Sequence, residues 1–330
     1  MVTNEGGPVE IHKGTKVIDT LNHDVVAEDA ETVYEELGKE CVGGTLDFDT
    51  SEIEKRYYLD NVSADSTTKT DIVLEIYDHH VGTVQRLPFS IKSFMGNSPT
   101  LLNSSESTNF IYRLKGELSS DDIDRINSML VSGGKVDVIG RVKAIYDAGC
   151  ELEFEKPQND TFDGNLRVVD SALPEILGQM LLDRYLIGTS SISELTKHLS
   201  KTNPMKYRGP HEFYKVKICR LLMASFTGMK AYRVWNDFDE VHGGYIVVRA
   251  DGKVVCYYLN NRNKFEEYLF NRTYLETYGA KRSKFASIER DEKGLIFKLN
   301  LDIRMKGSAP SNEGADFVTN DSGQTKLGDC

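Results

Sequence analysis

The sequence predicts a mixed α and β fold, and three observations lead to this fold class. Apolar residues recur at helical spacing in several stretches, of which 171–187 and 211–227 are the longest. Other stretches are short, rich in β-branched and aromatic residues and bounded by turn residues, which is typical of strands. The chain has 330 residues, of which 39% are hydrophobic, and this is enough for one large domain or two modest ones.

The first half of the chain is expected to contain a β-hairpin. Residues 1–16 are expected to be frayed, and apolar residues at helical spacing predict a helix over 28–37. The run from Asp71 to Tyr77 reads as one strand, 78–83 as a turn and 87–94 as the second strand. The elements expected next are a strand at 109–115, a helix capped by Ser120 and extending to about 130, a helix at 136–147 and a strand at 152–155.

The second half is expected to begin with helices and to end with strands. Pro174 favours the first turn of a helix, and Asp251-Gly252 is a typical two-residue hairpin turn. The expected elements, in order, are helices at 171–187, 192–199 and 211–227, strands at 245–249 and 253–259, a helix at 264–270, and strands at 285–289 and 295–303. Residues 307–330 are rich in Gly, Ser, Asn and Asp and are expected to be disordered.

Charge is distributed unevenly along the chain, whose formal net charge is −11. Residues 201–306 hold 21 Lys and Arg against 12 Asp and Glu, whereas residues 1–60 hold 5 against 15. Binding to nucleic-acid phosphate requires Lys and Arg. The second half is therefore the expected phosphate-contacting part, and the first 60 residues are not.

The five cysteines are scattered and form no C-x-x-C pair, so we expect reduced structural thiols and no zinc site. No window approaches the roughly 18 apolar residues that a membrane span requires, and no early stretch has the pattern of a secretory signal. The sequence therefore predicts no membrane association and a cytoplasmic location.

The hairpin carries the residues that suggest chemistry. Asp71 opens the first strand, and Ser90-Ile91-Lys92 lies near the end of the second strand. Residues 90 and 92 share a face because the strand period is two, and the hairpin would bring Asp71 beside them. A strand carboxylate and a nearby lysine are what metal-assisted hydrolysis of a phosphodiester requires.

The surrounding sequence resembles the HpaII family of type II restriction endonucleases. The matching blocks run in order from about residue 66 to 306, and the clearest ones are Thr70-Asp-Ile-Val-Leu74, Phe89-Ser-Ile-Lys-Ser93, Ser98-Pro-Thr-Leu-Leu-Asn-Ser104, Thr108-Asn-Phe-Ile-Tyr112, Phe265-Glu-Glu-Tyr-Leu-Phe-Asn271 and Lys298-Leu-Asn-Leu-Asp-Ile-Arg304. The arrangement of Asp71 and Lys92 is also that of the PD-(D/E)xK nuclease core, in which Ser90 would replace one acid.

The resemblance implies a restriction-endonuclease-like core with helical and β-hairpin elaborations. The expected parts are an acidic N-terminal segment at 1–60, a catalytic core at 61–160, a DNA-binding half at 161–306 and a tail at 307–330. The resemblance further implies Mg²⁺-dependent cleavage of double-stranded DNA at CCGG that leaves a 5′-phosphate. A companion DNA cytosine methyltransferase is implied as well, and the enzyme would act as a monomer or a homodimer.

Another carboxylate must replace the acid that is missing at Ser90. Glu106 is the first candidate, and Glu75 and Glu36 are the alternatives. On this interpretation Asp71, Glu106 and the Ile91 carbonyl ligate magnesium, and Lys92 steadies the attacking hydroxide.

Polar and basic residues are candidates for contacts with DNA. Arg and Lys read guanine, so a G and C site requires basic and small polar residues near the cut. The polar candidates, which follow Lys92, are Asn97, Ser98, Thr100, Asn103, Ser104 and Asn109. The basic candidates are Arg262, Lys281, Arg282, Lys284 and Arg304, and those expected to follow phosphate are Lys206, Arg208, His211, Lys215 and Lys217.

Two other functions remain open from the sequence. Asp78-His79-His80, with Asp47 and Asp49 upstream, superficially resembles DHH-type metal phosphoesterases, although the triplet falls in the expected hairpin turn. The chain could also be a DNA-binding protein without catalysis, in which case neither Asp71 nor Lys92 would be needed. Magnesium-dependent cleavage of a plasmid distinguishes these functions.

Overall fold

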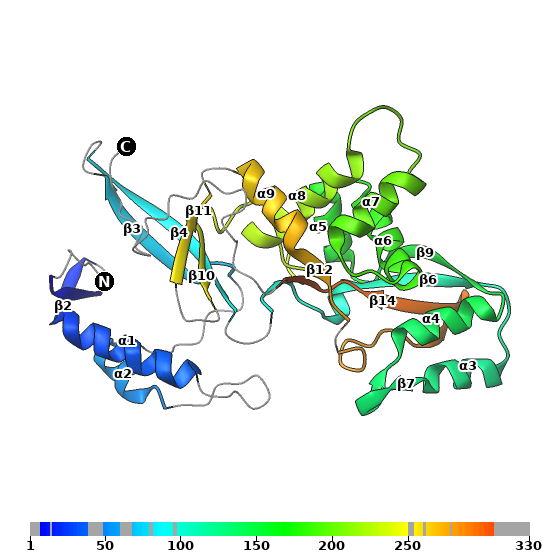
Figure 1. Cartoon of the computed structure of the whole chain (residues 1–330), viewed down its shortest axis with the longest axis horizontal. Helices are drawn as coiled ribbons and strands as arrows, with labels where there is room; N and C mark the ends of the chain where they lie inside the picture. Colours follow the sequence, from blue (N-terminus) through cyan, green and yellow to red (C-terminus); the bar gives the residue numbers. More distant parts are fainter. Residues whose placement is uncertain are drawn as a thin grey trace.

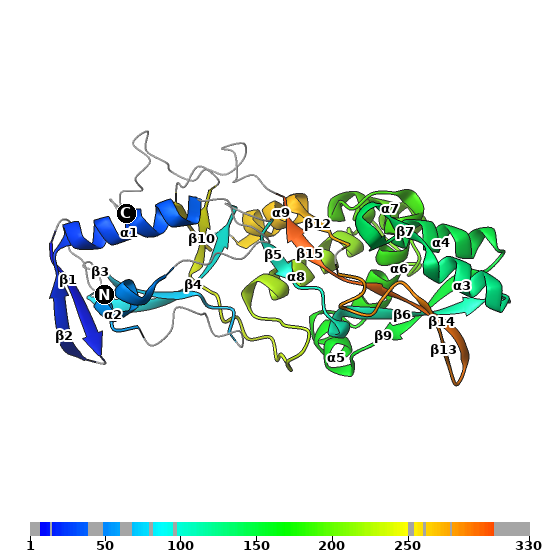
Figure 2. The ribbon, with the colours of Figure 1, turned by 90° about the horizontal axis from the view of Figure 1, so that it is seen from below.

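A sheet of four strands stands at one end of an elongated molecule (Figures 1 and 2). The computed structural model describes residues 7–13, 15–38, 49–59, 68–78, 82–94, 98–249, 254–259, 262–277 and 279–306. The sheet has the order β11-β10-β4-β3 and is built from β3 (Ile72–Asp78), β4 (Thr83–Ser93), β10 (Gly244–Val248) and β11 (Val254–Tyr258). β3 and β4 form the hairpin that the sequence predicts, and β10 lies parallel to β4.

Gly243 allows β10 to approach β4. A Cβ atom at this position would lie 2.8 Å from the Leu87 Cβ and 2.9 Å from the Pro88 carbonyl oxygen. The Gly243 amide instead donates to that carbonyl oxygen at 3.0 Å, just before the parallel pairing begins. A residue with a side chain would push the two strands apart.

A second four-stranded sheet lies at the opposite end of the molecule. Its order is β13-β14-β6-β9, and its strands are β6 (Asn109–Lys115), β9 (Glu151–Pro157), β13 (Ile288–Asp291) and β14 (Gly294–Asn300). A three-stranded sheet between the two ends has the order β12-β15-β5, with β5 (Thr100–Leu102), β12 (Thr273–Leu275) and β15 (Ile303–Met305). Each of these three sheets therefore contains strands that precede residue 160 and strands that follow it.

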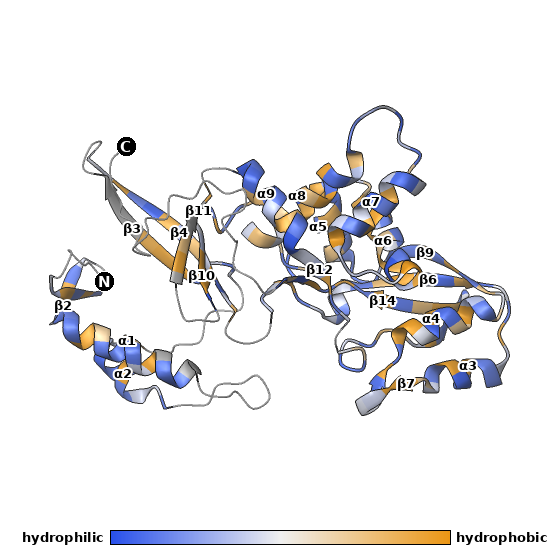
Figure 3. Cartoon of the chain, in the orientation of Figure 1, coloured by the Kyte–Doolittle hydropathy of each residue, from blue (hydrophilic) through white to orange (hydrophobic). Residues whose placement is uncertain are grey.

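Helices and strands of the described chain together form one large cluster of buried apolar residues. Tyr112 in β6 donates to the Gly178 carbonyl at 2.6 Å, and a Cβ at Gly178 would meet the Phe154 ring, so α6 packs closely on the sheet. β10 is apolar along its length, whereas α3 is mostly hydrophilic (Figure 3). The helices are α1 (His23–Gly38), α2 (Ser51–Arg56), α3 (Ser120–Ser128), α4 (Val138–Asp147), α5 (Asp160–Val169), α6 (Leu173–Ile187), α7 (Ile192–Thr202), α8 (Phe213–Thr227) and α9 (Arg262–Arg272).

Most of the predicted helices and strands are confirmed, but three details are wrong. Residues 9–21 form a hairpin of β1 (Val9–Lys13) and β2 (Lys16–Leu21), because the apolar side chains of Val9 and Ile11 are buried. The N-cap of α3 is Ser119, whose Oγ accepts from the Asp122 amide, so the cap lies one residue earlier than expected. The strand expected at 295–303 is two strands, which pair in different sheets.

Two expected features lie in parts of the chain that the structure does not describe. The predicted tail at 307–330 and the histidines at 79 and 80 lie outside the described residues.

The cysteines Cys150, Cys219 and Cys256 are free thiols, as expected. In the part of the chain that the structure describes, no helix is long and apolar enough to cross a bilayer.

Candidate active site

Asp71 and Ser90 meet across the β3–β4 hairpin. The amide of Asp71 donates to the Phe89 carbonyl at 2.9 Å, which places Asp71 at the start of β3 opposite the end of β4. The Oδ2 atom of Asp71 accepts two hydrogen bonds, from Ser90 Oγ at 3.0 Å and from the Ile91 amide at 2.6 Å. This carboxylate is therefore oriented by the strand that carries the lysine.

Lys92 lies on the same face of β4 as Ser90, as the strand period predicts. Its Nζ is 5.9 Å from the centre of the Phe226 ring on α8. Burial lowers the pKa of Lys92 below its usual value, and the charge of Asp71 opposes this effect. A lysine in this setting gives up its proton more readily than one at the surface.

Asp71 and Lys92 line a pocket of about 360 Å³. Thr100, Leu101, Leu102, Asn103 and Ser105 form one wall, which belongs to β5 and the residues that follow it. The remaining lining residues are Thr68, Lys69, Asp71, Ser90, Lys92, Lys230, Ala231 and Tyr232. Segments far apart in the sequence therefore contribute to one site.

The pocket is cationic, because three of its four charged lining residues are lysines. Lys69 donates from Nζ to the carbonyl oxygens of Leu101 at 3.1 Å and Ser225 at 2.8 Å. Burial, together with the charges of Lys92 and Lys230, lowers the pKa of Lys69 to about 7. These charges make the pocket suited to an anion.

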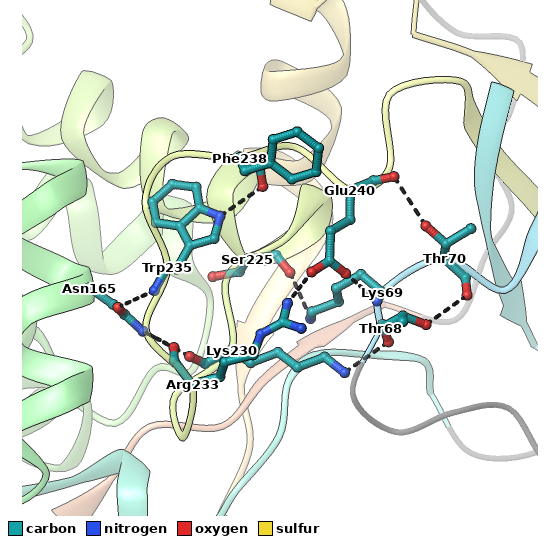
Figure 4. Close-up of polar contacts among 10 residues, drawn as sticks. All are labelled: Thr68, Lys69, Thr70, Asn165, Ser225, Lys230, Arg233, Trp235, Phe238 and Glu240. Atoms are coloured by element: carbon teal, nitrogen blue, oxygen red, sulfur yellow. Dashed lines mark hydrogen bonds and ion pairs between the residues drawn. The ribbon is translucent and has the colours of Figure 1, made fainter. Parts of the chain in front are cut away.

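The loop between α8 and β10 carries Lys230 into the pocket (Figure 4). Asn165 on α5 holds this loop, because its Nδ2 donates to the carbonyls of Lys230 and Arg233 and its Oδ1 accepts from the Trp235 amide. Lys230 Nζ donates to the Thr68 carbonyl at 2.8 Å. The loop is thus connected both to the helices and to the chain just before Asp71.

Glu240 fastens the end of this loop to the segment that precedes Asp71. The amide of Lys69 donates to Glu240 Oε2 at 2.7 Å, and Thr70 Oγ1 donates to the Glu240 carbonyl at 3.1 Å. Arg233 forms an ion pair with the same carboxylate (Figure 4). Three consecutive residues before Asp71 are therefore positioned by the loop.

The Asp71 carboxylate at the pocket suits a hard divalent cation that keeps most of its water ligands when it binds a protein. Mg²⁺ typically binds one or two carboxylates and completes its shell with water and substrate phosphate. Asp71 supplies a carboxylate here, and the described residues contain no group of three or more His, Cys, Asp or Glu that could enclose a metal. A cation that is shared with a bound phosphate fits this arrangement, whereas a closed protein cage does not.

The Glu106 side chain is placed away from the pocket lining. It is exposed on the short 3-10 helix Glu106–Thr108, and its carboxylate pairs with Lys284 Nζ at 2.9 Å. Exposed ion pairs of this kind contribute only about 0–1 kcal/mol, so the carboxylate is easily released. Its role as a metal ligand stays a prediction. The Glu75 side chain lies outside the described part, and Glu36 lies on α1.

The polar candidates for DNA contacts divide into three groups. Thr100 and Asn103 line the pocket, Ser98 accepts from Arg304 through its carbonyl, and Ser104 bonds to Ser283. Asn109 is fully buried, and its amide bonds to Gln158, to the Ser283 carbonyl and to Asn300. Asn109 therefore serves the interior of the fold and presents nothing to a ligand. Asn97 lies outside the described residues.

The basic candidates are dispersed. Lys281, Arg282 and Lys284 are exposed in the turn before β13, whereas Arg262 pairs with Glu266 and Asp239 beside a different pocket. Arg304 is mostly buried next to Asp302. Among the residues expected to follow phosphate, Lys206, Arg208 and His211 lie between α7 and α8, Lys215 pairs with Glu212, and Lys217 pairs with Asp170.

Sequence reasoning missed Lys69, Lys230 and Tyr232, which line the pocket. Lys69 carries a signal in the sequence, since it lies two residues before Asp71. Lys230 and Tyr232 carry none, because only the folding of the loop brings them to the hairpin.

Comparison with known proteins shows the family to which the chain belongs. The family profile described as HpaII restriction endonuclease matches residues 3–305. The type II restriction enzyme HpaII of Haemophilus parainfluenzae is 35% identical to the chain over 252 residues, which is 76% of this chain and 68% of that enzyme. No solved structure gives a significant match. The chain therefore belongs to the HpaII family of type II restriction endonucleases, which are site-specific deoxyribonucleases.

Proposed function

We propose that this enzyme hydrolyses one phosphodiester in each strand of double-stranded DNA at CCGG, with Mg²⁺, and leaves a 5′-phosphate. The observation that carries this proposal is the meeting of Asp71, Ser90 and Lys92 at a cationic pocket. The target sequence and the ends are those implied by the resemblance to the family. A pocket rich in lysines supports a phosphate as the ligand.

The β3–β4 hairpin would be the PD-(D/E)xK unit of the fold. Asp71 takes the place of the first acid, Ser90 stands where the second acid is usual, and Lys92 follows two residues later. The hairpin belongs to a mixed sheet, in which β10 runs parallel to β4 along the edge of the hairpin opposite β3. These features support the assignment without requiring a particular acid at residue 90.

Mg²⁺ bound at this site would activate a water molecule and offset negative charge on the reacting phosphate. Asp71 and the Ile91 carbonyl are the residues that would hold it, with Glu106 as the further ligand that we infer from the resemblance. Ser90 contributes by orienting Asp71 through the hydrogen bond at 3.0 Å.

Lys92 would act beside the attacking oxygen. Its Nζ is partly buried near Phe226 and lies within the electrostatic influence of Asp71. In its charged form the ammonium group stabilises negative charge that develops on the attacking oxygen and the phosphate.

We propose the residues that contact the bases from where these residues lie in the structure. Thr100 and Asn103 line the pocket and would lie close to the cut DNA, whereas Lys281, Arg282 and Lys284 form an exposed basic turn. Residues 201–306 have an excess of basic residues, 21 against 12 acidic ones, which suits the role of a DNA-binding half. Bidentate contacts from Arg or Lys to guanine are the common means of reading such a site.

We infer that a companion cytosine methyltransferase protects the host's own CCGG sites, because an active nuclease of this specificity would otherwise cut them. A palindromic target fits either a homodimer with two-fold symmetry or a monomer that cuts each strand in turn.

A digest of unmethylated DNA tests the proposed function. The purified protein is incubated with Mg²⁺ or with EDTA, and the ends are mapped by sequencing. We expect discrete 5′-phosphate ends at CCGG in the presence of Mg²⁺ alone. Cleavage at another sequence would contradict the specificity, and cleavage in EDTA would contradict the metal requirement.

A further inference from the structure

We propose that Lys230, supported by Lys69, binds a second backbone phosphate of DNA next to the phosphate that is cut at Asp71 and Lys92. This inference rests on the proposed function, because it assigns a DNA ligand to a part of the pocket that the catalytic motif does not use. Lys230 is far from that motif in the sequence but lines the same pocket.

The first argument is the balance of charge in the pocket. Its charged lining residues are Lys69, Lys92 and Lys230 against the single carboxylate of Asp71. Like charges gathered in a half-enclosed space are unfavourable unless an anion or a hydrogen-bonding partner compensates them. Lys92 belongs to the proposed catalytic motif, and Lys69 and Lys230, whose Nζ atoms donate to backbone carbonyls, place two further ammonium groups at the same pocket.

The second argument is that Lys230 is held firmly in place. Its carbonyl accepts from Asn165 Nδ2 at 2.9 Å, and its Nζ donates to the Thr68 carbonyl at 2.8 Å (Figure 4). The Nζ also lies 5.9 Å from the centre of the exposed Tyr232 ring. A lysine whose backbone and ammonium group are both positioned loses little further freedom when it binds a phosphate.

Lys69 lines the same pocket as Lys230 and is held in a fixed position. Its Nζ donates to the Leu101 and Ser225 carbonyls, and its amide donates to Glu240. These three bonds fix both ends of the residue. Lys69 is therefore fixed in the lining of the pocket, and Lys230 lies beside Tyr232 in the same lining.

The lining of the pocket fits a phosphodiester in particular. Thr100, Asn103 and Ser105 contribute a hydroxyl, an amide and a second hydroxyl to the lining, and such groups are common donors to phosphate oxygens. Asp71 and Lys92 line the same cavity, so a phosphate bound here would lie beside the one that is cut. Free phosphate has the same chemistry, and the experiment below separates it from DNA.

The experiment measures binding of a CCGG duplex to the Lys230→Gln variant in Ca²⁺, across a range of NaCl concentrations. Loss of one phosphate contact on B-DNA reduces the slope of log K against log salt by about 0.9. We expect this reduction together with weaker binding at low salt. Lys230→Arg keeps the charge and is expected to keep the slope. Lys143→Gln, an exposed lysine on α4, is the matched control and is expected to behave as the wild type.

A chemical substitution in the DNA identifies the contact itself. Each phosphate near the cut is replaced in turn by a neutral methylphosphonate, and both proteins are tested on each duplex. We expect one position at which the replacement weakens binding of the wild type but not of Lys230→Gln. If the effects of the protein and DNA changes are additive at every position and the salt slope is unchanged, the proposal is overturned. This result would leave Lys230 with the structural task of holding Thr68.

Two further readouts keep the outcomes distinct. If inorganic phosphate at constant ionic strength competes with DNA only in proteins that retain Lys230, while no methylphosphonate position couples to it, the ligand is free phosphate and the DNA contact is rejected. If the wild type neither binds nor cuts the CCGG duplex, the proposed function itself fails. Normal cutting by the wild type with no change in Lys230→Gln rejects this inference alone. Thermal unfolding of each variant shows whether an altered affinity reflects loss of folding, in which case Lys230→Arg decides the result.

Discussion

The Oγ of Ser90 donates to Asp71 Oδ2 at 3.0 Å, so in the proposed active site the residue that would replace a second acid is bonded to the first acid. The Ile91 amide donates to the same oxygen at 2.6 Å. Serine at this position therefore positions a carboxylate instead of adding one. The second acid must then come from elsewhere in the chain or from ligands that the DNA supplies.

Replacing Ser90 by alanine tests this positioning role. The variant loses the hydroxyl that orients Asp71, and losing a partner of a metal-binding group typically lowers activity by about 10- to 100-fold. We expect this loss in single-turnover cleavage, with little change in the Kd for DNA. Ser93→Ala, an exposed position on the same strand, serves as the control. An unchanged rate for Ser90→Ala would show that the Ile91 amide alone orients Asp71.

The Glu106→Gln variant tests whether Glu106 supplies the second acid that is missing at Ser90. As a metal ligand, Glu106 would be required for cleavage but not for binding, so we expect a loss of cleavage with the Kd for DNA retained. Raising the Mg²⁺ concentration is expected to restore part of the rate, because the defect lies in metal affinity. Glu153→Gln removes an exposed acid that forms a similar surface ion pair with Lys115 and is the control. Equal, small effects of both changes would reduce Glu106 to a surface ion pair.

Gly243→Ala tests the contact between β10 and β4. The added Cβ would meet the Leu87 Cβ at 2.8 Å and the Pro88 carbonyl oxygen at 2.9 Å. Overpacking of this kind costs about 1–3 kcal/mol, and we expect this decrease in the free energy of unfolding in urea. Gly164→Ala, at an exposed site on α5 with no atom within 4 Å of the new Cβ, should instead stabilise the protein by roughly 0.5–1 kcal/mol. A Gly243→Ala protein of normal stability would show that the strands separate without strain.

Asp302 makes the stability of the protein depend on pH. Its carboxylate is buried 3.6 Å from Arg304 Nε, and burial raises the pKa from the usual 3.8 to about 6. Because the folded state binds this proton more tightly than the unfolded state, ionisation destabilises the fold as the pH rises through 6, and the effect is absent below about pH 4.

We therefore expect Asp302→Asn to gain stability relative to the wild type between pH 4 and pH 7. The gain is roughly 3 kcal/mol, from 1.36 kcal/mol for each unit of pKa. Urea unfolding of both proteins at the two pH values measures it. A difference between the proteins that does not change with pH would show that Arg304 fully compensates the buried charge.

The sequence predicted the hairpin of the site because its information is local. Alternating strand residues, a short turn and the period of two place Asp71, Ser90 and Lys92 together without reference to the rest of the chain. The parallel pairing of β10 with β4 could not be predicted in the same way, because the two strands are about 150 residues apart in the sequence. Gly243, which permits the pairing, looks like an ordinary turn glycine in the sequence.

The lysines of the pocket illustrate the same limit. Lys230 reaches the site because Asn165 and Glu240 shape the loop that carries it, and no short motif records these contacts. Asn109 shows the reverse case, since a polar residue in a promising segment is fully buried and bonded to Asn300. Residue type and spacing predicted that Asp71, Ser90 and Lys92 lie together, whereas burial decided which neighbouring polar residues line the pocket.

The most direct test of the site is single-turnover cleavage of a CCGG duplex by Asp71→Ala and Lys92→Ala, alongside binding of the same duplex in Ca²⁺. We predict that each variant binds the duplex specifically but cleaves it at least about 100-fold more slowly than the wild type, because each loses a group that stabilises the reacting phosphate. Cleavage by either variant at the rate of the wild type would contradict the assignment of the active site.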